Sequence, residues 1–559
     1  MKKSLFNRKE TITDRIIHLI KTREFIIVTA IFVFALIVRL YNLNDNIIFA
    51  YDQGRDAQRV WDIVKNGDLK IVGPETDIPG VFNGPLFYYI LAPIYALSNF
   101  DANTAAVFFV VLNASGVILL YLTSNILFTD RRVGYLAGIL WAVSYQQLNF
   151  ARFISNASPM SIATMVFFYG LAVYIFQKKN IGLILSVVGL AAATHFNIYL
   201  IYLGALYPFF YYTYSPKIHK RTLLLSVGTL GITLLPWLIA ELVWDFSAIR
   251  AFLNYFGEQA VLTGVIENLD KYINRISEMS YYSFFSFNLT LAFLMTVIFS
   301  YFTYVHDNGN RKKMFFLLTW ALSTGPLFAF NSGVLAGTVI NSSIFAPFTL
   351  IWAAGIALLL SKRLHYVGYC LLSLVIIFNI SLMSKDHFQN VQILSHQPLL
   401  LGHEKQVVDY THNTSSSADF SICAMTNPPF VNSVWSHIYK TYGEEKYDRL
   451  PFWAGLEQDR NKNHLPYDVS RVKTRYLILE PLNGLPDYSQ KLYIYNEDHI
   501  SDLVEEKMFG VVTVQKRILK EKPIFTDTQS LSLQEIQLLN TINLQDSRYT
   551  CNVQYNNMQ

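Results

Sequence analysis

The stretch FIIVTAIFVFALIVRLYNL (residues 25–43) is an almost unbroken apolar run, and it decides the class of fold. A helix of about 20 apolar residues crosses the hydrocarbon core of a bilayer. A basic segment precedes the run, as in a signal peptide, but the run is too long and no A-x-A cleavage site follows it. We therefore expect an uncleaved first membrane span, with the N-terminus on the inner side.

Apolar runs of span length recur along the chain. Together they predict eleven transmembrane helices, near residues 25–43, 104–127, 133–149, 158–176, 181–196, 197–214, 221–240, 285–305, 313–330, 342–360 and 365–383. The fold class expected for this part is an all-α polytopic membrane domain.

The composition supports the same class. Of the 559 residues, 52% are hydrophobic and only 15% are charged, whereas soluble chains usually carry about 25% charged residues. Only three Cys are present, so a disulfide scaffold is excluded, and the apolar content excludes a disordered or collagen-like chain. No basic stripe with interleaved aromatic residues occurs, and we expect no nucleic-acid partner.

Every second connection between the predicted spans is basic. These connections read DRR (130–132), QKK (177–179), SPKIHKR (215–221), NRKK (310–313) and SKR (361–363). Basic loops stay inside, so the pattern predicts a multi-pass protein of the cytoplasmic membrane, with the N-terminus inside and the C-terminal region outside.

The apolar segment GPLFYYILAPIYAL (84–97) does not fit this alternation as a further span. It is short, it contains Pro85 and Pro93, and counting it as a crossing would put the basic connections outside. We expect a re-entrant or interface-lying helix on the outer side. The regions expected outside are then residues 44–103, 241–284 and the chain from about 385.

The C-terminal region has the patterns of a small globular domain. FSICAMT (420–426), RYLILEP (475–481) and VVTVQKRIL (511–519) have strand character, while VNSVWSHIYKTYG (431–443) and HISDLVEEKM (499–508) have helical periodicity. We predict two domains: a transmembrane domain over 1–384 with the outer loop 44–103, and an extracytoplasmic α/β domain over 385–559.

The outer loop carries a dense charged motif, YDQGRDAQR (51–59). Residues 53–65 are expected to form an amphipathic helix, on which Asp52 and Asp56, and Arg55 and Arg59, are spaced as i,i+4 pairs. On the structural interpretation, Asp52 caps this helix and the charges form a solvated face. On the functional one, Asp52 takes a proton from an acceptor hydroxyl, and the arginines bind a lipid-borne phosphate.

Further polar residues lie near the expected outer ends of spans. Arg152 is either paired, snorkelling or bound to a phosphate, and His195 is either a substrate-binding residue or a buried histidine bonded to backbone. Glu241 is either a cavity acid or an interface residue. In the loop that precedes the interface helix, Glu75 and Asp77 are either acids without a role or a second acidic element near Asp52.

Three segments resemble the GT-C superfamily of integral-membrane glycosyltransferases, and within it the branch of protein O-mannosyltransferases and lipid A aminoarabinose transferases. They are RLYNLNDNIIFAYDQGRDAQ (39–58), NGPLFYYILAPIYAL (83–97) and TDRRVGYLAGILWAVSYQQLNFARFISNASP (129–159). The resemblance covers about residues 25–380. It implies a polyprenyl-phosphate sugar donor, transfer with inversion on the extracytoplasmic side, and Asp52 as the catalytic base or its organiser.

The sequence departs from the family pattern at two places. The second acid of the usual Asp-Glu pair is Gln53 here, so the pair offers one carboxylate to a metal instead of two, and Asp56, one turn further on, is the candidate substitute. The usual His-Pro-Pro-Leu is Asn83-Gly84-Pro85-Leu86, which lacks the histidine. A divalent cation is therefore the only cofactor considered, and its ligands are not assigned.

The prediction is an inverting glycosyltransferase with Asp52 as catalytic residue. The substrate-binding candidates are Arg55, Asp56, Arg59, Arg152, His195 and Glu241. The expected partners are a polyprenyl-phosphate-linked sugar, membrane lipids, and an acceptor that is a protein, a lipid or a glycan. The alternative is a transporter or flippase of a lipid-linked saccharide. That function calls for charged or broken helices at the bilayer midplane, whereas the polar residues here gather at outer span ends.

Overall fold

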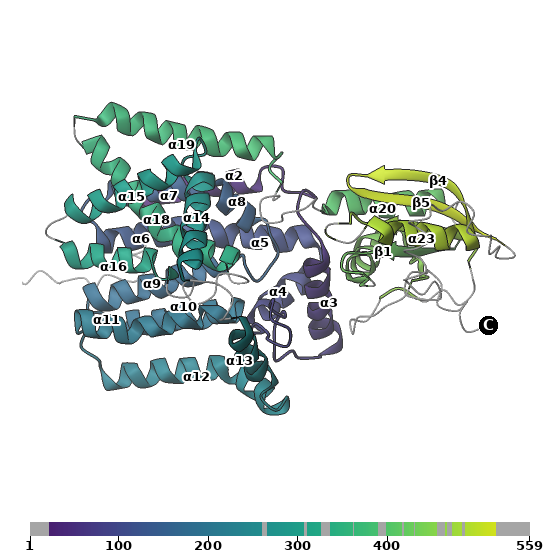
Figure 1. Ribbon diagram of the computed structural model, residues 1–559, viewed down its shortest axis with the longest axis horizontal. Helices are drawn as coiled ribbons and strands as arrows, with labels where there is room; N and C mark the ends of the chain where they lie inside the picture. Colours follow the sequence, from purple (N-terminus) through teal and green to yellow (C-terminus); the bar gives the residue numbers. More distant parts are fainter. Residues whose placement is uncertain are drawn as a thin grey trace, which may run out of the picture.

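The computed structural model describes residues 22–259, 265–306, 310–325, 336–361, 363–389, 399–415, 419–429, 431–455, 464–466, 472–482, 484 and 487–520. The structure has two parts that lie end to end along its long axis (Figure 1). One is a bundle of apolar helices, and the other is a smaller domain built on a β-sheet.

The bundle helices coincide with the apolar runs of the sequence. They are α2 (Arg23–Leu40), α5 (Ala102–Ala114), α6 (Gly116–Leu127), α7 (Arg132–Val143), α8 (Tyr145–Ala151), α9 (Met160–Phe176), α10 (Ile181–Phe196), η1 (Ile198–Ala205), α11 (Leu206–Tyr214), α12 (Lys220–Val243), α15 (Leu289–His306), α16 (Arg311–Ala321), α18 (Ala336–Ser361) and α19 (His365–Lys385). Within the described residues, four helices have the length and composition to cross a membrane: Ala102–Leu127, Lys220–Val243, Ser343–Ser361 and His365–Lys385. The chain is a multi-pass membrane protein, and the number eleven stays a prediction.

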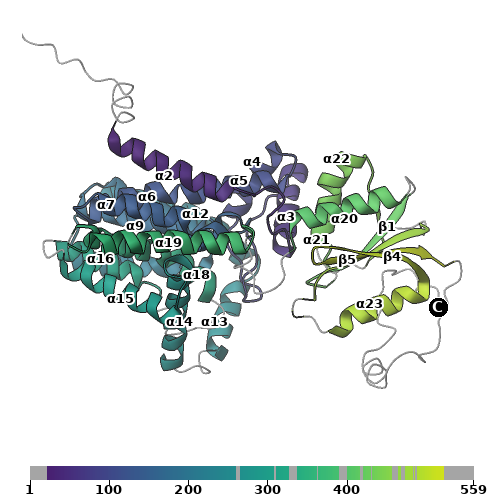
Figure 2. The same cartoon turned by 90° about the horizontal axis from the view of Figure 1, so that it is seen from above.

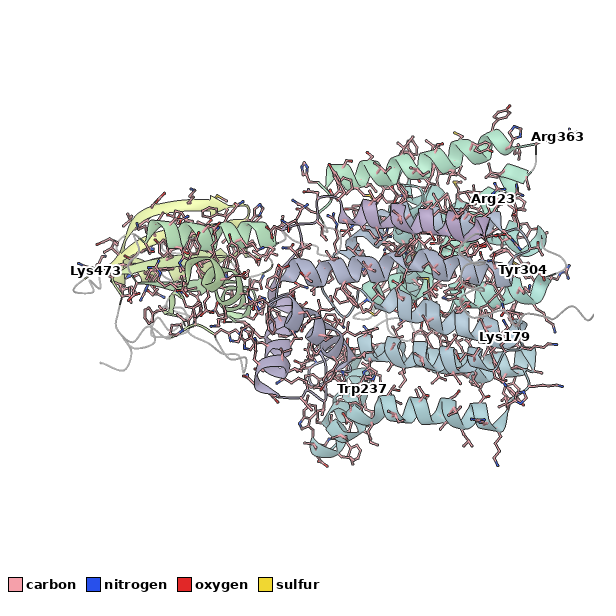
Figure 3. The ribbon with its side chains drawn as sticks, turned by 180° about the vertical axis from the view of Figure 1, so that it is seen from behind. Arg23, Lys179, Trp237, Tyr304, Arg363 and Lys473 are labelled. Atoms are coloured by element: carbon pink, nitrogen blue, oxygen red, sulfur yellow. The ribbon has the colours of Figure 1, made fainter. Side chains whose placement is uncertain are left out.

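The basic connections gather at one end of the bundle. Arg23, Lys179 and Arg363 lie toward that end, and the sheet domain with Lys473 lies at the other (Figure 3). This separation agrees with the alternation of basic loops in the sequence. The basic segment before Thr22 lies outside the described residues.

Two short helices lie at the end of the bundle that faces the sheet domain. They are α3 (Tyr51–Asn66) and α4 (Leu86–Leu97), the predicted amphipathic and interface helices (Figure 1). Gly67 ends α3 in a left-handed conformation, with a φ of 68° that favours glycine. The region 241–284, which was expected outside, forms α13 (Ser247–Gln259) and α14 (Val265–Ser283).

The smaller domain is a mixed five-stranded sheet with helices on both faces. Its strands are β1 (Phe420–Met425), β2 (Phe452–Trp453), β3 (Thr474–Leu479), β4 (Ser501–Phe509) and β5 (Val512–Leu519), in the order β2-β1-β3-β5-β4. β1 runs parallel to β2 and β3, and β5 runs antiparallel to β3 and β4. Figure 2 shows α20 (Leu401–Thr414) and α23 (Asp487–Ile500) on opposite faces. The remaining helical segments are α21 (Ser433–Ile438), η4 (Tyr439–Gly443) and α22 (Glu444–Tyr447).

One predicted element of this domain is wrong. Residues 499–508 were expected to be helical, but α23 ends at Ile500 and the chain continues as strand β4. A turn at Gly510, with a φ of 59°, joins β4 to β5 as an antiparallel hairpin. The apolar side chains of Leu503 and Met508 are exposed, so no buried face holds this segment as a helix, and backbone pairing with β5 decides its structure.

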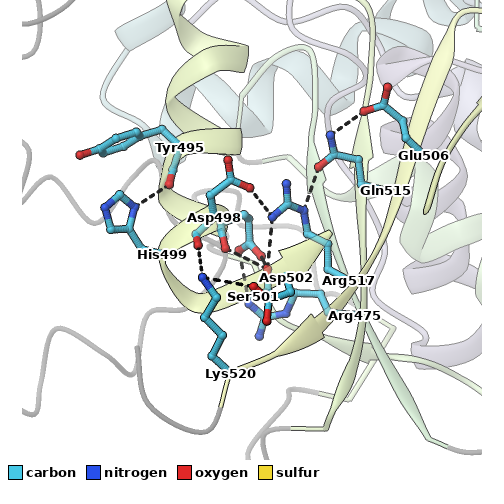
Figure 4. A network of polar contacts seen from close by, with 11 residues as sticks. Arg475, Tyr495, Asp498, His499, Ser501, Asp502, Glu506, Gln515, Arg517 and Lys520 are labelled. Atoms are coloured by element: carbon cyan, nitrogen blue, oxygen red, sulfur yellow. Dashed lines mark hydrogen bonds and ion pairs between the residues drawn. The ribbon is translucent and has the colours of Figure 1, made fainter. Parts of the chain in front are cut away.

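Buried charges fix α23 to the sheet (Figure 4). Arg475 on β3 pairs with Glu497 on α23 at 3.3 Å, and both side chains are buried. Arg517 on β5 donates to Asp498 at 2.7 Å. Because buried charges need partners, these pairs define how the helix lies on the sheet.

The two parts of the protein meet on α3. An ideal Cβ at Gly54 would lie 2.8 Å from the backbone nitrogen of Val434 and 2.9 Å from the carbonyl carbon of Ser433, both on α21. The rings of Phe49 and His437 stack at 5.3 Å, and those of Trp61 and His464 lie 4.7 Å apart. The helix that carries the charged motif is therefore also the docking surface of the sheet domain.

Gly54→Ala is expected to weaken this docking. Alanine is the better helix former, but its methyl group would meet backbone atoms that cannot rotate away. We expect a loss of about 1–3 kcal/mol in stability, measured as a lower unfolding temperature of the sheet domain. Gly228→Ala on α12 is the matched control because its Cβ would meet nothing within 4 Å. Equal unfolding temperatures for both variants would contradict the close approach at Gly54.

Candidate active site

Gln53, rather than Asp52, closes the N-terminus of α3. The helix begins after Ala50, whose backbone N–H donates to Oε1 of Gln53 at 3.0 Å. The Gln53 Nε2 group donates to the carbonyl of Ile154 at 3.0 Å, and the side chain is buried. The interpretation of Asp52 as the cap of this helix is therefore wrong. The Gln53 side chain, at the position of the second family acid, makes the capping hydrogen bond instead.

Gln53→Glu is expected to destabilise the protein, although it restores the acid of the family pattern. A glutamate oxygen cannot donate to the Ile154 carbonyl, so a buried acceptor would lose its partner and face another oxygen. We expect a loss of about 1–3 kcal/mol, measured by thermal unfolding. Gln53→Met, which removes the polar ends without adding a charge, separates the charge effect from the lost bonds. A fully stable Gln53→Glu variant would show that the position tolerates an acid.

Asp52, Arg55, Asp56 and Tyr88 form one connected cluster between α3 and α4. The Arg55 guanidinium binds Asp52 Oδ1 through Nη1 at 2.9 Å and Asp56 Oδ1 through Nη2 at 2.9 Å. The Tyr88 hydroxyl donates to the same Asp56 oxygen at 3.2 Å. The Asp52 side chain is 55% exposed, while that of Asp56 is only 2% exposed. The geometry thus leaves Asp52 open to a substrate and places Asp56 behind it.

The electrostatics of the cluster follow from this burial. Burial raises the pKa of Asp56 to about 6, although Arg55 opposes the shift, and the charge of Asp52 adds to it. Burial alone would lower the pKa of Arg55, but the carboxylates of Asp56 and Asp52 outweigh it and raise the pKa. Arg55 is therefore a permanent cation that holds two carboxylates.

The raised pKa of Asp56 predicts a pH dependence of stability. The folded chain binds this proton more tightly than the unfolded chain, whose Asp has a pKa near 3.8. The contribution of Asp56 to stability is therefore expected to fall as the pH rises from about 4 to about 6, and to stay level above that. We expect the difference in unfolding free energy between wild type and Asp56→Asn to change by about 1–3 kcal/mol over this range. Parallel thermal unfolding curves from pH 4 to pH 8 would contradict the assignment.

Arg59 lies one turn further along α3. It is half-buried, and it makes no hydrogen bond or ion pair within the described residues. Its charge acts on the buried Tyr88, whose pKa is raised by burial and by Asp56, and lowered by Arg55 and Arg59. Arg59 is therefore close to the cluster, and no described residue occupies the donors that it could offer to a ligand.

The loop before α4 brings a further acid toward Asp52. Burial and the charge of Asp52 raise the pKa of Asp77, so the two carboxylates interact. Glu75 instead accepts from the backbone N–H of Gly80 at 2.6 Å. The two loop acids therefore have different surroundings. Glu75 accepts a backbone hydrogen bond within the loop, whereas Asp77 interacts electrostatically with Asp52.

His195 contacts this loop at Gly84, whose backbone N–H donates to the His195 carbonyl at 2.9 Å. Its Nε2 atom lies 2.8 Å from the carbonyl of Thr233, which only accepts, so Nε2 carries the proton. The ring packs on Trp237 at 4.5 Å, and an ideal Cβ at Gly84 would lie 2.0 Å from Nδ1. This is the geometry of a buried histidine bonded to backbone. It explains why glycine stands where the family has proline.

Arg152 does not join the Asp52 cluster. It is fully buried, its Nε donates to the carbonyl of Arg39 at 3.0 Å, and its terminal nitrogens donate to the carbonyls of Tyr41 and Phe388. Arg39 in turn donates to the carbonyls of Trp141 and Ala142. Two buried arginines thus bind the backbone at the C-terminal ends of α2 and α7.

Glu241 lines an apolar pocket of about 400 Å³ next to the loop before α4. Its Oε2 atom accepts from the backbone N–H of Ile249 at 3.2 Å, near the start of α13. Val72, Phe82, Tyr199 and Trp237 form other parts of the wall. Glu241 is therefore both a pocket residue and a partner of the α13 backbone.

The acids of the cluster do not form a site for a divalent cation. Among the described residues, no group of three or more His, Cys, Asp and Glu side chains is arranged to hold a metal ion. The carboxylates of Asp52 and Asp56 already share the Arg55 guanidinium, and the neighbouring Gln53 is occupied by backbone groups. We therefore assign no step to a metal.

Sequence analysis missed two contributors to this site. Tyr88, which bonds Asp56, sits in the apolar interface helix, where an aromatic residue is usually a packing residue. Gln53 differs from the family acid, and only the structure shows what it binds. The sequence signal for Tyr88 is the paired Tyr in PLFYY (85–89), directly after the helix start.

The comparisons with known proteins agree with this architecture. Residues 82–244 match the family model of dolichyl-phosphate-mannose-protein mannosyltransferases. No curated protein matches the sequence. The fold is similar to that of ArnT from Cupriavidus metallidurans bound to undecaprenyl phosphate, with 11% identity and a TM-score of 0.52, over 88% of this chain and 97% of that chain.

Two further structures resemble the chain more weakly. The apo state of the same ArnT gives 12% identity and a TM-score of 0.45 over 88% of this chain and 97% of its own. The arabinofuranosyltransferase AftD from Mycobacteria gives 12% identity and a TM-score of 0.44 over 72% of this chain and 29% of its own. The family match over 82–244 and the ArnT-like fold confirm the resemblance predicted from the sequence, to the GT-C superfamily and within it to the branch of the protein mannosyltransferases and ArnT.

Proposed function

We propose that the protein is an inverting glycosyltransferase that moves a sugar from a polyprenyl-phosphate donor to an acceptor hydroxyl on the outer face of the cytoplasmic membrane. One observation carries the proposal. A half-exposed carboxylate, Asp52, is held by the largely buried Arg55 on α3, one turn from Arg59, a cation without an ion pair among the described residues. The undecaprenyl phosphate bound to ArnT, a protein of similar fold, supports the class of donor.

The proposed reaction begins at Asp52. Its carboxylate accepts the proton of the acceptor hydroxyl as the hydroxyl oxygen attacks the anomeric carbon. The new C–O bond forms on the face opposite the phosphate, and the bond from the anomeric carbon to the phosphate oxygen breaks. The bonding electrons leave with that oxygen, so the products are the glycosylated acceptor and the polyprenyl phosphate. Water then takes the proton from Asp52.

The negative charge that develops on the leaving phosphate needs a cation. The Arg55 guanidinium pairs with Asp52 and Asp56, and the Arg152 guanidinium binds backbone carbonyls. Neither guanidinium is therefore available to bind a phosphate. Arg59 is the remaining candidate among the arginines predicted from the sequence. We therefore assign the phosphate contact to Arg59, and a positioning role to Arg55.

The apolar pocket lined by Phe82, Trp237 and Glu241 suits the lipid part of the donor. Its wall includes the loop whose Asp77 interacts with Asp52, so a prenyl chain in the pocket would place its phosphate near α3. Glu241, the acidic residue of the pocket wall, would then lie near the bond that joins the prenyl chain to its phosphate.

Mass spectrometry of lipids from the host tests the proposal. Strains with the wild-type gene, with a deletion and with Asp52→Asn are compared. We expect one polyprenyl-phosphate sugar to accumulate in the deletion and in Asp52→Asn, which would also identify the donor. Accumulation in the deletion alone would move the chemistry away from Asp52. If no such lipid accumulated in either strain, flipping of a labelled glycolipid in vesicles would favour a transporter.

A further inference from the structure

A second pocket lies where the bundle and the sheet domain meet. It has a volume of about 260 Å³ and is formed by the turn between α4 and α5, together with α20, α21, η4 and α22. We call it the junction pocket. Its wall contains Asn99, Asp101, Lys405, His437, Thr441 and Glu445.

Two buried polar atoms on its wall have no partner among the described residues. They are Nδ1 of His437, whose side chain is only 2% exposed, and Oγ of Ser98. A buried polar atom without a hydrogen bond costs free energy, so such atoms mark places where a ligand or water completes the structure. Both atoms line the same small pocket, and a hydroxyl group can donate to one and accept from the other.

The charges on the wall are already satisfied. Lys405 binds Asp45 at 2.6 Å, and Asp101 accepts from the backbone N–H of Thr104 at 2.9 Å as the cap of α5. Glu445 accepts from the Asn99 side chain at 3.3 Å. Lys405, the cation among the lining residues, is thus already paired, and the wall offers no free cation to an anionic ligand. Its hydrogen-bonding groups and the Tyr442 ring suit a compact molecule that carries several hydroxyls on an apolar frame.

The pocket is coupled to the proposed active site by direct contact. The His437 ring on its wall stacks on Phe49, which lies directly before the start of α3 and three residues before Asp52. The other wall begins at Ser98, where α4 ends. A ligand in the pocket would therefore contact His437, which packs on the segment before α3, and Ser98, the C-terminal cap of α4.

From this geometry we propose that the junction pocket binds one neutral sugar unit of the acceptor. The proposal rests on the proposed function and narrows it, because the acceptor is then a glycan or a glycoconjugate rather than a bare protein hydroxyl. The sugar in the pocket is a recognition unit, and the hydroxyl that reacts lies elsewhere on the acceptor, at Asp52.

Saturation-transfer NMR on the full chain, in a detergent without a sugar headgroup, tests the binding directly. The probes are the methyl glycosides of glucose, galactose, mannose, N-acetylglucosamine and xylose, with methyl glucuronide and a short neutral peptide for comparison. We expect at least one neutral glycoside to bind, and to compete with none of the comparison probes. Failure of all neutral glycosides, or binding of only the uronide or the peptide, would overturn the proposal.

Three variants locate the bound sugar. Glu445→Ala is expected to weaken binding about five- to tenfold, because a hydrogen-bonding group is removed from the wall. Thr441→Trp fills the pocket and is expected to abolish binding at an unchanged unfolding temperature of the bundle. Glu444→Ala is the matched control, since this neighbouring acid on α22 pairs with Lys440. Equal binding by Glu445→Ala, Thr441→Trp and Glu444→Ala would place the sugar outside the pocket.

Binding and transfer are read separately. Asp52→Asn is expected to bind the glycoside as tightly as the wild type. If Asp52→Asn bound the glycoside and transferred sugar at the wild-type rate, the assignment of Asp52 as the base would be wrong and the sugar site in the junction pocket would stand. If Asp52→Asn lost transfer but neither the wild type nor any variant bound a glycoside, the sugar site in the junction pocket would be wrong and the assignment of Asp52 as the base would stand.

Discussion

Asp52→Asn is expected to reduce sugar transfer about 10²–10⁴-fold, the usual contribution of a general base. The amide keeps the shape of the side chain and can still accept from Arg55 through its oxygen, but it cannot take a proton from the acceptor. The carboxylate is 55% exposed, so the fold does not depend on burying it. We expect an unfolding temperature close to that of the wild type, and a loss that lies in kcat for the acceptor reaction.

Asp62→Asn is the matched control for this change. Asp62 lies on the same helix and pairs with Lys70 at 3.3 Å, away from the Arg55 cluster. It is expected to leave the rate unchanged within about twofold. If Asp52→Asn turned over as fast as Asp62→Asn, Asp52 would not be the base, and Asp77 would be the next candidate because it interacts with the same charge.

Arg59→Gln is expected to reduce transfer about 10²–10³-fold, the range measured when one preorganised donor to a developing charge is removed. Gln keeps the three side-chain carbons that pack along α3 and a polar end, but it is shorter and carries no charge. Arg59 has no ion-pair partner among the described residues, so its replacement leaves no buried carboxylate unpaired. The loss is expected in kcat and in the KM for the donor, whereas the KM for the acceptor stays constant.

Lys65→Gln is the comparison for Arg59→Gln. This cation lies further along α3 and packs over the ring of Trp61 at 5.6 Å. An equal effect of both changes on the donor would mean that the general charge of the helix attracts the phosphate. An effect of Arg59→Gln on the acceptor KM instead would move Arg59 to the acceptor side of the site.

The sequence predicts the bundle well because run length and loop charge are local properties. Each predicted span overlaps a helix among the described residues, although 313–330 extends beyond them, and the expected outer helices are α3 and α4. The charged motif is also predicted, since its spacing places the charges on one helix. Which charges pair is not predictable in this way. The i,i+4 spacing suggested two like-charged pairs, whereas Arg55 binds Asp52 at i,i+3 and the adjacent Asp56.

The parts of the site that the sequence could not predict depend on contacts between distant segments. Arg152 reads as an anion-binding residue, but its donors bind the carbonyls of Tyr41 and Phe388, which lie more than 100 residues away in the chain. Gln53 reads as a lost acid, but it binds the backbone at Ile154. Residues 499–508, most of which form strand β4, were expected to be a helix because of their helical periodicity, and the pairing with β5 is not visible locally.

The docking of the sheet domain on Gly54 has a consequence for how the protein is made. The ribosome delivers α3 before most of the described bundle helices and α21 after all of them. On the proposed topology, the sheet domain must be exported before Ser433 and Val434 can cover the face of α3 at Gly54. A chain that stops at Lys385 would carry every bundle helix and the Asp52 motif, yet leave that face bare. On this topology, the docked form is therefore completed by a domain that is exported after the bundle helices, which ties the proposed activity to a finished export step.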